Sequence, residues 1–91
     1  MMTEQKKKAL IAIKKANSLT NKIIEMIESG EYCIDIMQQN LAAIGLLRSA
    51  HESLMGNHLN SCFKSAMQTT NTKKQQQMTE EILKVTKLFN K

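Results

Sequence analysis

Three residues of the sequence have side chains that bind soft metal ions: Cys33, His58 and Cys62. They lie in a proline-free stretch whose apolar residues recur at helical spacing, which predicts one long amphipathic helix from Cys33 to about Met67. At about 100° per residue, the three side chains fall within about 20° of one face of that helix. Two thiolates and an imidazole favour Cu(I) or Zn(II) as the bound metal.

Cys33 is too far from the other two residues for one chain to hold the metal. At a rise of about 1.5 Å per residue, Cys33 lies roughly 37 Å along the helix from His58. An antiparallel second copy, related by a two-fold axis, would place Cys33 of one protomer beside His58 and Cys62 of its partner, and would do so twice. His58 and Cys62, an i, i+4 pair, are the local half of the site. The spacing therefore predicts an inter-subunit site in a homodimer.

The number of ligands favours one of the two metals. Structural zinc normally takes four protein ligands, whereas two cysteines and one histidine suit trigonal Cu(I). The alternative is that these residues are structural. A buried cysteine often packs as a small hydrophobic side chain, and a lone histidine on a helix face is commonly structural.

The composition indicates a small all-helical protein. The chain has 91 residues, and a core of this size is marginal unless oligomerisation buries more surface. Aromatic residues make up only 3%, so Leu, Ile, Ala and seven Met supply the apolar content, which is typical of helices. With no run of about 18 apolar residues and no apolar block near the N-terminus, we expect neither a membrane span nor a signal peptide. We therefore expect a cytoplasmic protein with no membrane partner, whose two cysteines are thiols.

Helix signals divide the chain into three segments. Thr3 is a suitable N-cap, and Gly30 suits the left-handed conformation that ends a helix. Gly56 is where a kink in the long second helix would fall. The predicted helices cover about residues 4–27, 33–67 and 74–90, with a polar loop over 68–73. The predicted fold class is all-α, a three-helix protomer whose long central helix pairs with a second copy, as in a four-helix bundle.

Positive charge gathers on the first predicted helix. The formal net charge is +5, and six lysines lie on this helix: Lys6, Lys7, Lys8, Lys14, Lys15 and Lys22. A basic surface of this kind suits a polyanion such as DNA. The alternative is a solvated face whose lysines serve solubility, and residue types alone do not separate the two.

Three sequence elements occur in an order that is specific as a set. They are Glu31-Tyr32-Cys33-Ile34-Asp35-Ile36, then Leu47-Arg48-Ser49, then Asn57-His58-Leu59-Asn60-Ser61-Cys62. With these elements the chain resembles the copper-sensitive operon repressor family, CsoR/RcnR, over about residues 10–89. The resemblance implies one metal-sensing repressor domain over residues 1–91 and an antiparallel dimer that assembles as a homotetramer, a dimer of dimers. It also implies DNA binding without a helix-turn-helix.

The resemblance assigns roles to individual residues. It implies a trigonal Cu(I) site with Cys33 from one protomer and His58 and Cys62 from the other, and the Cys, His, Cys set matches the copper-sensing type. Family repressors bind operator DNA when metal-free and release it on metal binding, through surrounding residues that correspond here to Tyr32 and Glu81. Glu80 competes with Glu81 for this role because the preceding loop makes the register uncertain. The alternative for Tyr32 is a half-buried residue that closes the first turn.

The DNA-binding residues implied by the resemblance are Lys14, Lys15 and Arg48. The family usually has a Gly-Gln pair in its first helix, and this chain has Ser18-Leu19 instead. Lysine neutralises phosphate but lacks the bidentate fork of arginine. The alternative function is therefore a Cu(I)-binding or thiol- or persulfide-sensing helical protein of the same fold that has lost operator recognition.

Two further expectations concern chemistry outside this set. His51 lies about one turn from Arg48, where it could add a ligand or a proton switch, although a histidine without such a role is commoner. No nucleophile is paired with a base away from the metal-binding residues, so we do not expect an enzyme.

Overall fold

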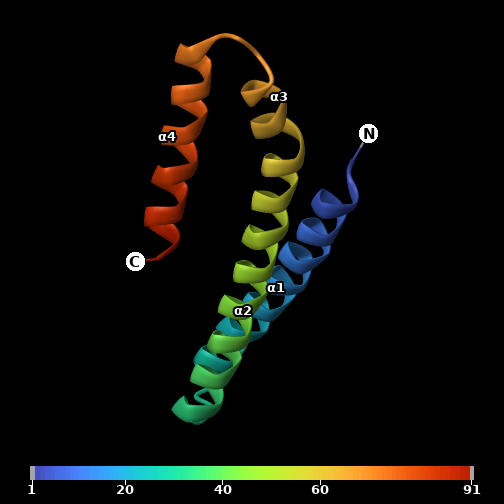
Figure 1. Cartoon of the computed structure of the whole chain (residues 1–91). Coiled ribbons are helices and arrows are strands. Elements are labelled where there is room, and N and C mark those ends of the chain that lie inside the picture. The colour runs from blue at the N-terminus through green and yellow to red at the C-terminus, as the bar shows by residue number, and fades with distance from the viewer. Residues whose placement is uncertain (1, 91) are drawn as a thin grey trace. The chain divides into compact units, whose positions relative to one another are not determined.

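A computed structural model describes residues 2–90, and every regular element in this part of the chain is helical (Figure 1). The helices are α1 (Glu4–Glu28), α2 (Cys33–His58), a π-helix η1 (Leu59–Phe63), α3 (Lys64–Met67) and α4 (Thr72–Phe89). The predicted all-α fold is confirmed. Within the described residues, no helix combines the length and the apolar character needed to cross a bilayer.

The chain forms two compact units, residues 2–57 and 58–90. Whether the chain functions as one metal-sensing domain stays a prediction.

The predicted start and end of the first helix are confirmed. The hydroxyl of Thr3 accepts a hydrogen bond from the backbone N–H of Lys6 at 3.1 Å, which satisfies one of the free N–H groups in the first turn. Gly30 has a φ of 72°, a conformation that glycine adopts at little cost. The N–H of Glu31 then bonds to the carbonyl of Met26 at 3.0 Å, which closes the helix end before α2 begins.

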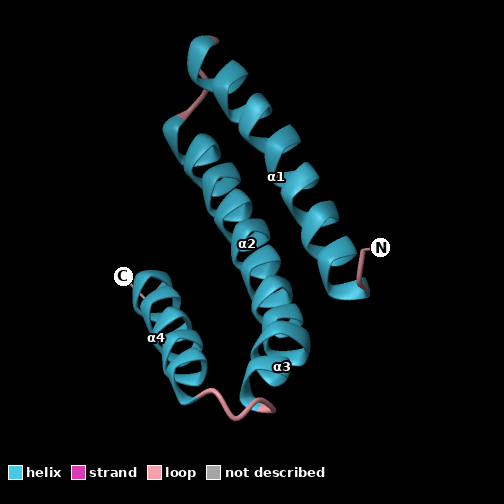
Figure 2. Ribbon diagram, turned by 90° about the horizontal axis from the view of Figure 1, so that it is seen from above, coloured by secondary structure: helices cyan, strands magenta, loops and turns pink. Residues whose placement is uncertain are grey.

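The first unit is a helical hairpin packed through alanines. α1 and α2 lie side by side and run antiparallel (Figure 2). Ala9, Ala12 and Ala50 form a buried cluster, and Ala16 and Ala43 are also buried. Ala9 and Ala16 on α1, like Ala43 and Ala50 on α2, are seven residues apart, so one narrow row of small side chains faces the neighbouring helix. Small residues in these rows let the two helix backbones approach closely.

The large apolar residues that mark both helices as amphipathic are mostly outside this core. On α2 they are Ile34, Met37, Leu41, Ile44, Leu47 and Leu54, and on α1 they are Leu10, Ile13, Ile24 and Ile27, all of them exposed. The hydrophobic pattern identified the helices correctly but not the faces that join them. A band of large apolar side chains therefore remains uncovered on this hairpin.

The predicted second helix continues to Met67 but changes its hydrogen bonding on the way. α2 passes through Gly56 and ends at His58, and a π-helical turn follows over Leu59–Phe63 before α3. The irregularity expected at Gly56 therefore falls three residues later, and it is a wider turn rather than a glycine kink.

The second unit is closed by the loop between α3 and α4. The side-chain amide of Gln75 donates hydrogen bonds to the carbonyls of Met67 at 3.2 Å and Thr69 at 2.7 Å. Asn71 caps α4 by accepting a bond from the N–H of Lys74 at 3.1 Å. Because of this cap, the helix starts at Thr72, two residues earlier than predicted.

Candidate metal centre and DNA-binding surface

Cys33 is the first residue of α2, directly after the turn that contains Gly30. Its thiol is free and exposed to solvent. A soft ligand in this position is accessible to a metal ion and to a second protein chain.

His58 and Cys62 lie at the other end of α2, directly before and within the π-helical turn. His58 is the last residue of α2 and is partly exposed, while Cys62 lies within η1 and is exposed as a free thiol. The hydroxyl of Ser61 lies 3.9 Å from the sulfur of Cys62 as a hydrogen-bond donor. A π turn holds about one residue more than an α turn, so residues four apart still come close to completing one turn.

The π turn is a feature that the sequence analysis missed. Residues 59–63 contain no proline or glycine that would announce a change of helix type. Single π turns inside helices are often found at functional sites. This turn contains one of the predicted metal ligands.

In the described part of one chain, no three metal-binding side chains come together in a group that could hold an ion. The donors themselves suit a soft metal, because two free, exposed thiols and a partly exposed imidazole are available. The assignment of Cys33, His58 and Cys62 as ligands of one shared site stays a prediction.

The residues expected to surround the metal are both exposed. Tyr32 immediately precedes Cys33 and is 70% exposed. The alternative interpretation, a half-buried residue that closes the turn, is therefore wrong. Glu81 lies on α4. Its competitor Glu80 accepts a hydrogen bond from the side-chain amide of Gln76 at 3.2 Å. The choice between Glu81 and Glu80 stays a prediction.

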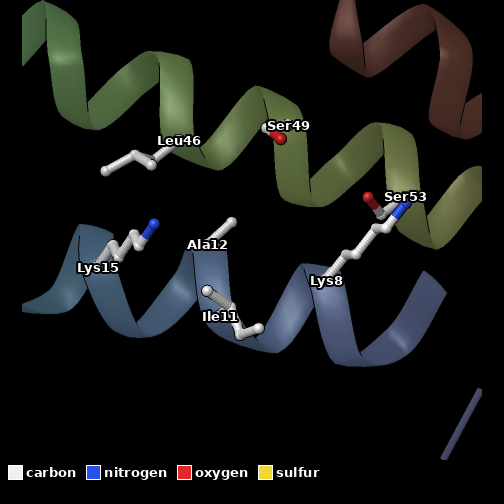
Figure 3. Close-up of a pocket in the computed structure, with 7 residues that line it drawn as sticks. All are labelled: Lys8, Ile11, Ala12, Lys15, Leu46, Ser49 and Ser53. Carbon is white, nitrogen blue, oxygen red and sulfur yellow. The ribbon is translucent and has the colours of Figure 1, made fainter. Parts of the chain in front are cut away.

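The three predicted DNA-binding residues are exposed but do not lie together. Lys15 lines a groove between α1 and α2, whereas Lys14 and Arg48 are not among its lining residues (Figure 3). Arg48 is two residues from the buried Ala50, so its side chain projects about 200° around α2 from the face that contacts α1. Arg48 also interacts with other residues of the chain. Contact between DNA and all three side chains would therefore need more than one face of the hairpin.

The comparison with known proteins decides the family. Residues 5–90 match the model of a family described as metal-sensitive transcriptional repressor. The chain belongs to this family. The resemblance expected from the three sequence elements is thereby confirmed, and the family is one of transcriptional repressors rather than a class of enzymes.

Family members similar to this chain carry copper-sensing names. The copper-sensing transcriptional repressor CsoR of Mycobacterium ulcerans (strain Agy99) is 38% identical over 66 residues, and CsoR of Mycobacterium tuberculosis (strain ATCC 25618 / H37Rv) is 35% identical over the same length. Each match covers 72% of this chain and 56% of the relative. The copper-sensing transcriptional repressor RicR of the same M. tuberculosis strain is 32% identical over 65 residues, which is 71% of this chain and 68% of that protein. The chain thus spans little more than half the length of the CsoR relatives.

His51 lies on α2, partly exposed, and interacts with other residues of the chain. In the sequence, His51 directly follows Ala50 and is three residues from Arg48. A role for His51 as an additional ligand or a proton switch stays a prediction.

Proposed function

We propose that this chain is a Cu(I)-responsive transcriptional repressor that binds operator DNA when metal-free and releases it when Cu(I) binds. The observation that supports this most is the placement of soft ligands at the two ends of α2 in a member of the metal-sensitive repressor family. Cys33 begins α2 and His58 ends it. Cys62 follows in η1.

The metal site is shared between two protomers in this proposal. α2 is 26 residues long, so its ends are roughly 37 Å apart at about 1.5 Å per residue. An antiparallel second copy supplies the missing half of each site, and two-fold symmetry makes two equal sites. The thiolates of Cys33 and Cys62 and the imidazole of His58 would hold Cu(I), which favours such a set of three soft ligands.

The uncovered apolar band gives the second copy a surface to bind. Leu41, Ile44 and Leu47 are exposed at 66%, 41% and 47% on α2. Burying side chains of this size against a partner would stabilise the dimer by about 25 cal/mol per Å² of apolar surface. A homotetramer built from two such dimers completes the proposed assembly.

DNA binding rests on the basic residues of α1 and on Arg48. Lys14 and Lys15 lie on α1, exposed to solvent, and the chain carries a net charge of +5. Neutralising phosphates releases condensed counterions, so binding should weaken steeply as salt rises. Metal binding can favour one of two arrangements of the protomers, only one of which presents these residues to a duplex. Tyr32 and Glu81 are the proposed residues that couple the metal site to this change.

Fluorescence anisotropy tests DNA recognition by the metal-free protein. Apo-protein is titrated into a labelled duplex from its own upstream region and into a scrambled duplex of equal length, at two salt concentrations. The proposal expects tighter binding to the upstream duplex and a steep fall with salt. Equal binding to both duplexes would instead favour a Cu(I)-binding or thiol-sensing protein that has lost operator recognition.

A further inference from the structure

The two flanks of the α1–α2 hairpin differ in chemistry. Four of the five α1 residues that directly follow a buried position are apolar, such as Leu10 after Ala9 and Ile24 after Ile23, and the exception is Asn17 after Ala16. Three of the five residues that directly precede a buried position are lysines. Because successive residues are about 100° apart, these two sets lie on opposite flanks of the helix.

The basic flank has a regular row of lysines. Lys8, Lys15 and Lys22 precede the buried Ala9, Ala16 and Ile23. The three lysines are seven residues apart, about 10.5 Å along the helix axis. A partner chain that covers the apolar flank would leave this row exposed to solvent.

A groove on this flank brings lysines and hydroxyls together. It has a volume of about 270 Å³ and is lined by Lys8, Ile11, Ala12, Lys15, Leu46, Ser49 and Ser53. Figure 3 shows Lys8 reaching from α1 toward Ser53 on α2, with Lys15 about two turns away along α1. No carboxylate is among the lining residues. The groove therefore presents two positive charges without a matching negative charge.

The hydroxyls of the groove are available to a ligand. Serine and threonine within helices often bond to a carbonyl of the preceding turn, as Thr20 does with Asn17 at 2.9 Å and Thr79 with Gln75 at 2.9 Å. Among the described residues, neither Ser49 nor Ser53 forms a hydrogen bond to another protein group through its side chain. Both can donate to an oxyanion that enters the groove.

We propose that this groove is a phosphate-binding site that takes one backbone phosphate of duplex DNA. The ammonium groups of Lys8 and Lys15 neutralise the phosphate, and the hydroxyls of Ser49 and Ser53 donate hydrogen bonds to its oxygens. With a volume of about 270 Å³, the groove has room for a phosphate group. The identity of the polyanion rests on the proposed function.

A second hollow continues the row and bears on the departure from the family pattern. It is lined by Lys15, Ser18, Leu19 and Lys22, all on α1. Ser18-Leu19 therefore lies between two lysines of the row, where Ser18 adds a hydroxyl. In this arrangement the lysine row can follow the DNA backbone without the Gly-Gln pair.

The test compares groove residues with matched residues outside it, using metal-free full-length protein and the upstream duplex. Lys8→Gln should lower the affinity for the duplex about tenfold. It should also reduce the slope of log affinity against log salt concentration by about one, because one fewer counterion is released. Lys84→Gln on α4, an exposed lysine outside α1 that does not line the groove, should change both much less. Ser49→Ala/Ser53→Ala should lower affinity about tenfold with an unchanged salt slope, because hydroxyls release no counterions. Ser65→Ala on α3 is its control.

An NMR titration with inorganic phosphate provides an independent readout of the groove. The wild-type amide signals of Ser49 and Ser53 should shift with phosphate, and Lys8→Gln should weaken that response. Helix content by circular dichroism shows that the variants are folded. If phosphate shifts these signals while the groove variants bind DNA like the wild type, the groove takes free phosphate and the DNA assignment is overturned.

The site and the proposed function can fail separately. A wild-type protein that binds its upstream duplex and releases it with Cu(I), together with groove variants that behave identically, would overturn the site alone. A wild-type protein that shows no affinity for any duplex would overturn the DNA assignment and the proposed function together. In that case the phosphate titration still decides whether the groove binds an oxyanion.

Discussion

The hydroxyl of Thr3 donates a hydrogen bond to the side-chain oxygen of Asn57 at 2.5 Å, joining two residues that are 54 positions apart. The same hydroxyl caps α1 by accepting a bond from the N–H of Lys6. Asn57 is 7% exposed and directly precedes the predicted ligand His58. One contact therefore starts α1 and holds it against the last turn of α2.

Replacing Thr3 should weaken the hairpin measurably. Thr3→Ala removes both the cap and a hydrogen bond to a buried amide, for an expected loss of about 1 to 3 kcal/mol in unfolding free energy. Urea unfolding followed by circular dichroism, at fixed protein concentration, measures it. Thr20→Ala is the control, since Thr20 is exposed and bonds only within its own helix. An equal effect of the two substitutions would show that the Thr3–Asn57 contact does not stabilise the fold.

The alanine row should tolerate no larger side chain. Ala50 is 1% exposed and belongs to the cluster with Ala9 and Ala12, so Ala50→Leu forces the two helices apart and should cost about 1 to 3 kcal/mol. Ala42→Leu, at an exposed position of the same helix, should be nearly neutral. Thermal and urea unfolding of both variants provide the comparison. If Ala50→Leu were as stable as the wild type, close packing through alanines would be wrong.

The sequence predicted which segments are helical better than how they pack. Thr3 and Gly30 marked the limits of α1 because capping and positive φ depend on single residue types. The large apolar residues, such as Leu41, predicted helices correctly, but most of them lie outside the α1–α2 contact. Small residues bury well yet give a weak hydrophobic signal, so the row containing Ala50 was not recognised.

The candidate site was predicted from residue types and from their spacing along a regular helix. Cys33, His58 and Cys62 were identifiable because few residues bind soft metals. The π turn around Cys62 depends on backbone hydrogen bonding that no single residue in it announces. The proposed phosphate-binding groove is lined by residues from two helices, such as Lys8 on α1 and Ser53 on α2. The sequence alone does not show that these residues are neighbours, because this depends on the register of the hairpin.

The proposed antiparallel dimer has a definite register. If Cys33 meets His58 and Cys62 of the partner, the two-fold axis falls midway along this segment, close to Leu47. Leu47→Cys in a Cys33→Ser/Cys62→Ser background should therefore form a disulfide between two protomers under mild oxidation. Glu52→Cys in the same background should not. Non-reducing electrophoresis of both proteins measures it, and equal cross-linking would contradict this register.

Complementary variants test whether two chains share each metal site. Cys33→Ala and His58→Ala/Cys62→Ala should each lose tight Cu(I) binding as homodimers, because two-ligand or one-ligand remnants lack the trigonal set. Mixed dimers should recover roughly one intact site, since each chain supplies what the other lacks. Competition with a Cu(I) chelator on purified, verified heterodimers measures the recovery. Absence of any recovery would rule out ligands from two chains.

The central claim is that Cu(I) binding at Cys33, His58 and Cys62 releases DNA. Its most direct test is an anisotropy titration of Cu(I) into a preformed complex of reduced protein and its upstream duplex, with Cys62→Ala as the matched variant. The account predicts release that reaches its end point near one Cu(I) per protomer, a coupling of about 1 to 3 kcal/mol, and no release from the Cys62→Ala complex. Unchanged anisotropy of the wild-type complex, or equal release from the variant, would contradict it.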